Sequence, residues 1–132
     1  MRRRLLEIAL MWLACSGCTG SNGDLPKAYR TIAVPEERLR STAARMKGRS
    51  LFLTHCALCH GDRADGRGVR REGLAQSPRD FTDDAWRRGT SPRRVYYVIR
   101  EGVHGTAMPG WKALPDDAIW DLVAYVLSVG AA

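Results

Sequence analysis

The strongest hydrophobic pattern lies near the C-terminus, where apolar residues recur with helical spacing. Ile119, Leu122, Val123 and Val126 stand at positions i, i+3, i+4 and i+7, which places them on one face of a helix. Pro115-Asp116-Asp117 comes just before this pattern, and its two carboxylates complement the positive end of a helix dipole. The pattern predicts an amphipathic helix that begins at about residues 115–117.

A second helix is marked at both ends by residues that start and stop helices. Ser91-Pro92 supplies an N-cap and a proline in the first turn, and Gly102 supplies the C-terminal stop. Between them Val95, Val98 and Ile99 form an apolar stripe. The caps favour a helix here, although Tyr96-Tyr97-Val98-Ile99 is β-prone in isolation.

A third helix is predicted over about Thr42 to Cys56, with Ser41 as its N-cap. Gly48 costs about 1 kcal/mol inside a helix, and close approach of another helix explains why it is there. A short helical turn is expected at 83–88. No segment reads convincingly as a strand, so the pattern predicts an all-α fold of three main helices plus short turns.

The N-terminal segment has the composition of an export signal. Three arginines follow Met1, and a short apolar run extends from Leu5 to Ala14. The run is too short for a permanent membrane span and has the length typical of a signal peptide. We therefore expect residues 1–17 to be removed, and the competing interpretation is an amphipathic N-terminal helix.

Two cysteines stand where such a signal would be cut, at Cys15 and Cys18. A cysteine at this junction after small residues resembles a bacterial lipobox, so lipid attachment at Cys18 or Cys15 is the favoured interpretation. Plain cleavage near this point is the alternative. The polar, turn-rich residues that follow predict a flexible tether over 18–40, leaving a domain over 41–130.

The most informative motif is Cys56-Ala57-Leu58-Cys59-His60. The pattern C-x-x-C-H attaches a c-type haem: the two sulfurs reach the two vinyl groups of one porphyrin, and the following histidine is held against the iron. C-x-x-C also occurs in zinc sites and in thiol redox centres, so zinc held by this motif and one more ligand, such as His104, remains an alternative.

The charge of the chain bears on its partners. The formal net charge is +7, and removal of residues 1–17 would leave +5. A basic surface on an exported protein suggests protein partners with acidic docking surfaces, or an anionic membrane. The arginines are scattered rather than aligned on one helix, and together with export this argues against nucleic-acid binding.

From about Gly48 to Val129 the sequence resembles the class I cytochromes c. The resemblance rests on Gly48 and Phe52 ahead of the haem motif, on Leu122-Val123-Ala124-Tyr125 near the C-terminus, and on the stretch 105–111 around Met108-Pro109. The stretch 78–83, between the haem motif and the next helix, is similar to one in small bacterial cytochromes of the respiratory chain. In that family the first and last helices cross at the positions of Gly48 and Phe52. The resemblance implies a cytochrome c fold around one haem c bound through Cys56 and Cys59.

The resemblance also implies a set of residues around the haem. His60 is the proximal iron ligand by its position in the motif, and Met108 in the Met-Pro loop is the expected distal ligand, with His104 as its competitor. The carbonyl of Pro78 is the candidate hydrogen-bond acceptor for His60. Arg79 is a candidate partner of the haem propionates, and Trp86 and Trp111 are expected to line the haem pocket.

These observations predict a periplasmic, lipid-anchored carrier of single electrons between respiratory partners, and not an enzyme by itself. Two other functions stay open. The chain could be the haem c subunit of a larger respiratory complex. A labile Met108 would instead give a domain that reacts with gas or peroxide.

Overall fold

A computed structural model describes residues 24–131 of the chain. Its main helices are α3 (Thr42–His55), α6 (Pro92–Glu101) and α7 (Asp116–Ser128), with α5 (Asp84–Gly89) between the first two. Three further short helices are α1 (Lys27–Arg30), α2 (Glu36–Arg40) and α4 (Ala57–His60). Residues 24–131 contain no strand. The predicted all-α class and its three main helices are confirmed, and Ser41 and Ser91 cap α3 and α6 as expected.

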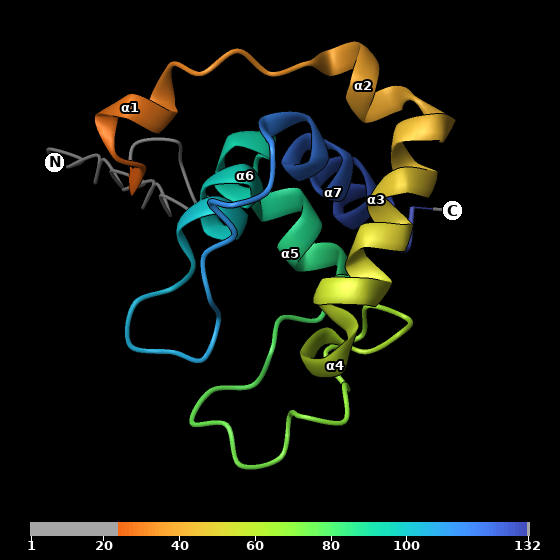
Figure 1. Ribbon diagram of the computed structural model, residues 1–132, viewed down its shortest axis with the longest axis vertical. Helices are drawn as coiled ribbons and strands as arrows, with labels where there is room; N and C mark the ends of the chain where they lie inside the picture. Colours follow the sequence, from red (N-terminus) through yellow and green to blue (C-terminus); the bar gives the residue numbers. More distant parts are fainter. Residues whose placement is uncertain (1–23, 132) are drawn as a thin grey trace, which may run out of the picture.

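The core forms where α3 crosses α7 (Figure 1). Gly48 lies at this crossing, and Phe52 packs on Tyr125 one turn further along α3, with ring centroids 5.2 Å apart. The fully buried side chains from α7 include Ile119, Leu122 and Val123. The predicted apolar face of the last helix is therefore the centre of the domain.

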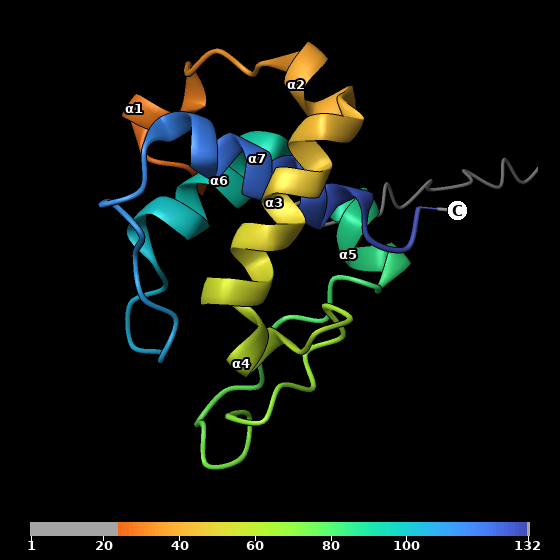
Figure 2. The ribbon, with the colours of Figure 1, turned by 45° about the vertical axis from the view of Figure 1, so that its right-hand side comes forward.

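Two long loops extend from the same side of this helical core. The segment 61–83 follows α4, and the segment 102–115 joins α6 to α7; both hang below the helices in Figure 1 and in the rotated view of Figure 2. The helix order therefore places the C-x-x-C-H turn and the Met-Pro loop at the same end of the domain. No helix within residues 24–131 is both long and apolar enough to cross a membrane.

The segment 24–40 differs from the predicted flexible tether. Leu25 is only 1% exposed, and Tyr29 packs against Tyr97 and donates a hydrogen bond to Glu101. Arg93 Nε donates to the carbonyl of Ile32 at 2.9 Å. This part of the chain is ordered because its apolar side chains pack against the domain and its polar groups form hydrogen bonds with α6. The rest of the predicted tether, and Cys15 and Cys18, lie outside the described residues.

Arg38 ties this N-terminal segment to the core. It contacts the carboxylate of Asp121 at 2.8 Å and that of Asp117 at 3.0 Å. Asp121 is 6% exposed and lies on the largely apolar helix α7. The hydrogen bond to Asp121 raises the pKa of Arg38 above its usual value. The ion pair therefore neutralises a buried carboxylate that would otherwise be costly.

Removing this guanidinium is expected to destabilise the domain. Arg38→Ala leaves the Asp121 carboxylate buried without its cation, so we expect the free energy of unfolding to fall by about 1–3 kcal/mol. Arg40→Ala is the matched control, because Arg40 pairs with Glu36 at 3.9 Å on the exposed surface and such pairs contribute about 0.2–1 kcal/mol. Denaturant unfolding of both variants measures the difference. Equal losses would show that Arg38 adds no more than a surface ion pair.

Candidate functional site

The candidate site is a largely apolar cavity of about 370 Å³ at the end of the domain where the two long loops meet. This volume falls within the range of about 300–1,000 Å³ found for cofactor pockets. Its walls come from α3, α4, α5, α6, α7 and both loops. The predicted residues that line it are Cys56, Cys59, His60, Pro78, Arg79, Trp86, Met108 and Trp111.

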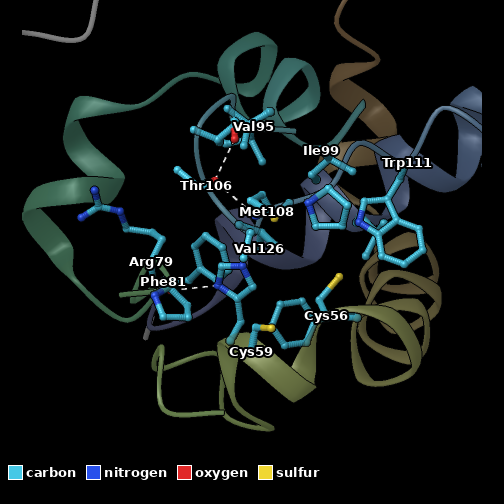
Figure 3. Close-up of a pocket in the computed structure, with 18 of the residues that line it drawn as sticks. Cys56, Cys59, Arg79, Phe81, Val95, Ile99, Thr106, Met108, Trp111 and Val126 are labelled. Atoms are coloured by element: carbon cyan, nitrogen blue, oxygen red, sulfur yellow. Dashed lines mark hydrogen bonds between the residues drawn. The ribbon is translucent and has the colours of Figure 1, made fainter. Parts of the chain in front are cut away.

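The motif Cys56–His60 enters the cavity on a tight helical turn. α4 follows α3 after the single residue Cys56, whose carbonyl accepts hydrogen bonds from the backbone amides of Cys59 and His60. This turn brings both sulfurs and the imidazole to the same cavity. Figure 3 shows Cys56 and Cys59 at one edge, with Met108 across from them.

The loop 61–83 folds back onto this turn and supports it. The amides of Gly66, Gly68 and Arg70 donate to the carbonyls of His60, Cys59 and Leu58, respectively, at 2.8–3.1 Å. These bonds satisfy carbonyls at the end of the short helix α4, which would otherwise need water. The position of the haem-binding turn is thus held by residues that follow it in the sequence.

His60 is oriented by two groups from the far end of the same loop. Its Nδ1 lies 3.1 Å from the carbonyl of Arg79, and its ring stacks on Phe81 with centroids 4.8 Å apart. The predicted acceptor, the carbonyl of Pro78, is therefore wrong by one residue. The pairing leaves Nε2 as the ring nitrogen available for a metal.

The electrostatics of the site suit neutral ligands. Burial lowers the pKa of His60 and outweighs the opposing effect of its hydrogen bond to Arg79, so the imidazole is neutral, the form that binds metals. Burial, and then the nearby Cys59, raises the pKa of the Cys56 thiol to about 11. This cysteine is therefore a neutral thiol at neutral pH and brings no charge to the cavity.

Met108 reaches the cavity on a loop that is tied to the end of α6. Gly102 ends α6 with a φ of 76°, and a Cβ there would lie 2.7 Å from the carbonyl oxygen of Met108. The amide of Val103 donates to that same carbonyl at 3.1 Å, and Trp111 donates to Ile99 at 2.9 Å. The backbone of the Met-Pro loop is thus closed on both sides of the methionine.

The remaining predicted residues behave differently from one another. Trp86 packs on Phe81, and Trp111 packs on His55 with ring centroids 4.9 Å apart, so both tryptophans form walls of the cavity. Arg79 lines the cavity with an exposed side chain and contributes its carbonyl. His104 lies exposed on the loop and does not line the cavity.

Sequence reasoning missed several residues of the site. Phe81, Arg94 and His55 also line the cavity. The stretch 78–83 carried a signal for Phe81, because it belongs to the family resemblance. Nothing in the local sequence pointed to Arg94, which comes to the cavity only through the packing of α6.

The residues present fit a haem. The cavity offers the imidazoles of His60 and His55, one thioether sulfur, the two thiols of the attachment motif and mainly apolar walls, and no aspartate or glutamate lines it. Arg79 and Arg94 are the cations on its lining, and they match the negative charge of haem propionates. Among residues 24–131 no three His, Cys, Asp or Glu side chains are placed to hold a metal ion together, which disfavours the zinc alternative.

Comparison with known proteins gives the same picture. Residues 43–126 match the family model described as cytochrome c oxidase, cbb3-type, subunit III. The Cbb3-type cytochrome c oxidase subunit FixP of Rhizobium meliloti (strain 1021) is 33% identical over 85 residues, which cover 64% of this chain and 27% of FixP. The chain thus aligns with only about a quarter of that relative.

Two shorter relatives agree with this. Cytochrome c55X of Stutzerimonas stutzeri is 37% identical over 70 residues, which cover 51% of this chain and 50% of the relative. The solved structure of the KustC0563 c-type cytochrome is 35% identical with a TM-score of 0.52, covering 62% of this chain and 95% of that one. The chain therefore belongs to this family of cytochrome c domains, and its cofactor is a haem c bound covalently through Cys56 and Cys59.

Proposed function

We propose that this domain carries single electrons, with His60 and Met108 as the two axial ligands of its haem iron. The observation that carries the proposal is that both side chains line one cavity together with the two attachment cysteines. When bound, the haem supplies a one-electron iron couple.

The residues of the chain keep the site suited to this role. The Arg79 carbonyl and Phe81 orient the imidazole of His60, and the backbone hydrogen bonds around Met108 support the loop that carries the thioether. A soft thioether ligand raises the reduction potential of a haem. Ligands on both sides would leave no open position for a substrate, so we propose a carrier and not an enzyme.

The setting of this transfer is a respiratory chain. FixP is by name a subunit of a cbb3-type cytochrome c oxidase, and this relationship supports a place beside respiratory proteins. Service as a haem c subunit of a larger complex is the second candidate, favoured by the same relationship. Co-purification of further haem proteins with the native chain from solubilised membranes would favour the complex over a free carrier.

The location of the protein rests on its N-terminal sequence. We propose that the chain is exported, that residues 1–17 are removed and that a lipid on Cys18 or Cys15 holds the domain at a cell-envelope membrane. Intact mass spectrometry of the mature protein tests this. A mature N-terminus with an unmodified residue would rule out the lipid anchor, and an uncut N-terminus would rule out the signal peptide.

Expression of the whole chain together with a c-type haem maturation system tests the cofactor and its ligands. We expect the intact mass to include one haem that survives denaturation, because the two thioether bonds are covalent. We also expect a low-spin, six-coordinate spectrum in both oxidation states. A colourless protein would refute the proposal, and a high-spin ferric signal or rapid carbon monoxide binding would favour the gas- or peroxide-reactive alternative.

A further inference from the structure

The outward face of α3 carries a row of exposed apolar side chains that the haem site does not use. Met46 and Leu53 lie on this helix two turns apart, opposite the face that Gly48 and Phe52 bury against α7. Leu58 on α4 and Val69 on the following loop continue the row. We call these four residues the outer stripe; they are between 37% and 84% exposed.

The lower end of the outer stripe is hollowed. Leu53, Leu58 and Val69 line a second cavity of about 370 Å³. The charged residues of its lining are Asp62, Arg63, Asp65 and Arg67. Figure 2 shows α3 in front of α7, with this outer side of the helix uncovered by the other described elements. Only one further large apolar side chain among residues 24–131, Val103, is comparably exposed. The concentration of the others in one place marks an interaction surface.

The same segment carries the basic excess of the described chain. Residues 42–71 contain seven arginines and lysines but two acidic residues, a net charge of +5, and residues 24–131 as a whole also have a net charge of +5. In the rest of the described chain positive and negative charges therefore balance. The whole excess lies in the segment that carries the outer stripe.

Six of these seven cations form no ion pair with a carboxylate of residues 24–131. Elsewhere most of the acidic residues of α2, α5, α6 and α7 are paired with arginine or lysine, whereas within 42–71 the one ion pair among the described residues joins Arg63 to Asp65. Lys47 and Arg49 flank the line from Met46 to Leu53 on either side of the helix. An apolar centre with an unpaired cationic rim is complementary to an apolar patch rimmed by carboxylates.

We propose that the outer stripe is the docking site of a redox protein whose surface has an apolar centre and an acidic rim. This inference rests on the proposed function. Leu58 lies between the two cysteines that line the haem cavity, so a partner seated on it approaches the attachment turn itself. In the docked pair one electron leaves one protein and enters the other, so the donor is oxidised and the acceptor reduced by the same single electron.

Two other occupants fit the surface less well. A second copy of this chain would bring two segments of charge +5 together, and like charges oppose association. An anionic membrane would match the cations but has no side chain to place in the hollow. A protein side chain of moderate size fits a hollow with apolar walls, whereas a lipid surface is flat.

Adsorption of the haem-loaded protein on chemically defined gold electrodes tests the proposal. The probe is a monolayer of mixed methyl- and carboxylate-terminated thiols, which imitates an apolar patch with acidic groups. We expect the wild-type protein to adsorb and to exchange electrons at low ionic strength. Adsorption should weaken as the Debye length shortens to about 8 Å at 0.15 M salt.

Three variants distinguish binding through the outer stripe from a general effect of net charge. Lys47→Glu and Lys27→Glu change the net charge equally, but Lys27 lies on α1, away from the stripe. We expect Lys47→Glu to weaken adsorption about three- to fivefold, the size expected of one exposed charge contact, and Lys27→Glu by less than twofold. Leu58→Gln should weaken adsorption on the mixed monolayer but not on a purely carboxylate one. Equal effects of the two lysine variants, or no effect of Leu58→Gln, would overturn the proposal.

Further measurements identify the other occupants and separate the two proposals. Binding to phosphatidylglycerol vesicles that Leu58→Gln abolishes, without an effect on the monolayer, would assign the surface to a membrane. Self-association in ultracentrifugation that Leu58→Gln abolishes would assign it to a second copy. A quartz microbalance records adsorption without haem, and the solution spectrum and potential of each variant are recorded separately. Adsorption without an electron signal would therefore count against the proposed function and not against the docking site.

Discussion

Gly48→Ala is expected to lower the free energy of unfolding by about 3 kcal/mol or more. A Cβ at this position would lie 1.9 Å from the carbonyl oxygen of Asp121 and 2.5 Å from its carbonyl carbon. Backbone atoms of α7 cannot turn aside as a flexible side chain can, so α3 and α7 must move apart along their whole contact. Overpacking of a core typically costs about 1–3 kcal/mol. The cost here should reach or exceed the upper end of this range, because the two main helices must move apart and a local rearrangement is not enough.

Gly89→Ala is the matched control for this prediction. Gly89 also lies in a helix, α5, and a Cβ there would have no neighbour within 4 Å. Alanine favours a helix over glycine by about 1 kcal/mol, so this variant should be neutral or slightly more stable. Denaturant unfolding of the haem-loaded proteins compares the two. A Gly48→Ala protein as stable as wild type would mean that the two helices do not cross as closely as the structure shows.

Met108→His is expected to lower the reduction potential of the haem by an amount on the order of 0.2 V. Axial ligands set haem potentials over a span of about 0.8 V, and an imidazole in place of a thioether favours the oxidised iron. The loop should keep its shape, because its hydrogen bonds use the backbone of Met108 and the side chain of Thr106. Potentiometric titration measures the shift, and Met108→Ala should in addition bind carbon monoxide in the reduced state.

Met46→Leu controls for the general effect of replacing a methionine. Met46 is the other methionine within residues 24–131, and its side chain is 67% exposed on the opposite face of α3 from the haem cavity. Its replacement should leave the absorption spectrum and the potential unchanged. If Met108→Ala kept a six-coordinate spectrum and the wild-type potential, the distal ligand would be a residue other than Met108, and this part of the proposed function would fall.

The helices of the domain could be located from the sequence because their signals are local. Ser41 and Ser91 cap the helices that they were expected to cap, and the i, i+3, i+4 pattern of α7 marks its buried face. The N-terminal segment could not be assigned in this way. Its polar, turn-rich composition hides contacts such as Tyr29 with Tyr97 and Arg38 with Asp121, which join residues 68 and 83 positions apart.

The haem site likewise has one part that local sequence determines and another that depends on the tertiary structure. Five consecutive residues, Cys56 to His60, specify the attachment chemistry without help from the fold, because two sulfurs and an imidazole at this spacing already match one porphyrin. The groups around the imidazole depend on how a loop of about twenty residues closes, which no short pattern encodes. The structure therefore placed the carbonyl of Arg79 where that of Pro78 was expected, and it brought Arg94 to the cavity.

Local sequence thus decided the helical class, the caps and the covalent chemistry of this protein, because each depends on neighbours within a turn or two of the chain. Packing between distant segments decided the depth of the cavity, the partner of His60, the burial of Asp121 beside Arg38 and the exposure of Met46, Leu53, Leu58 and Val69 on one surface. These properties depend on which helix faces pack against each other, and that is determined only when α3 packs closely against α7 at Gly48.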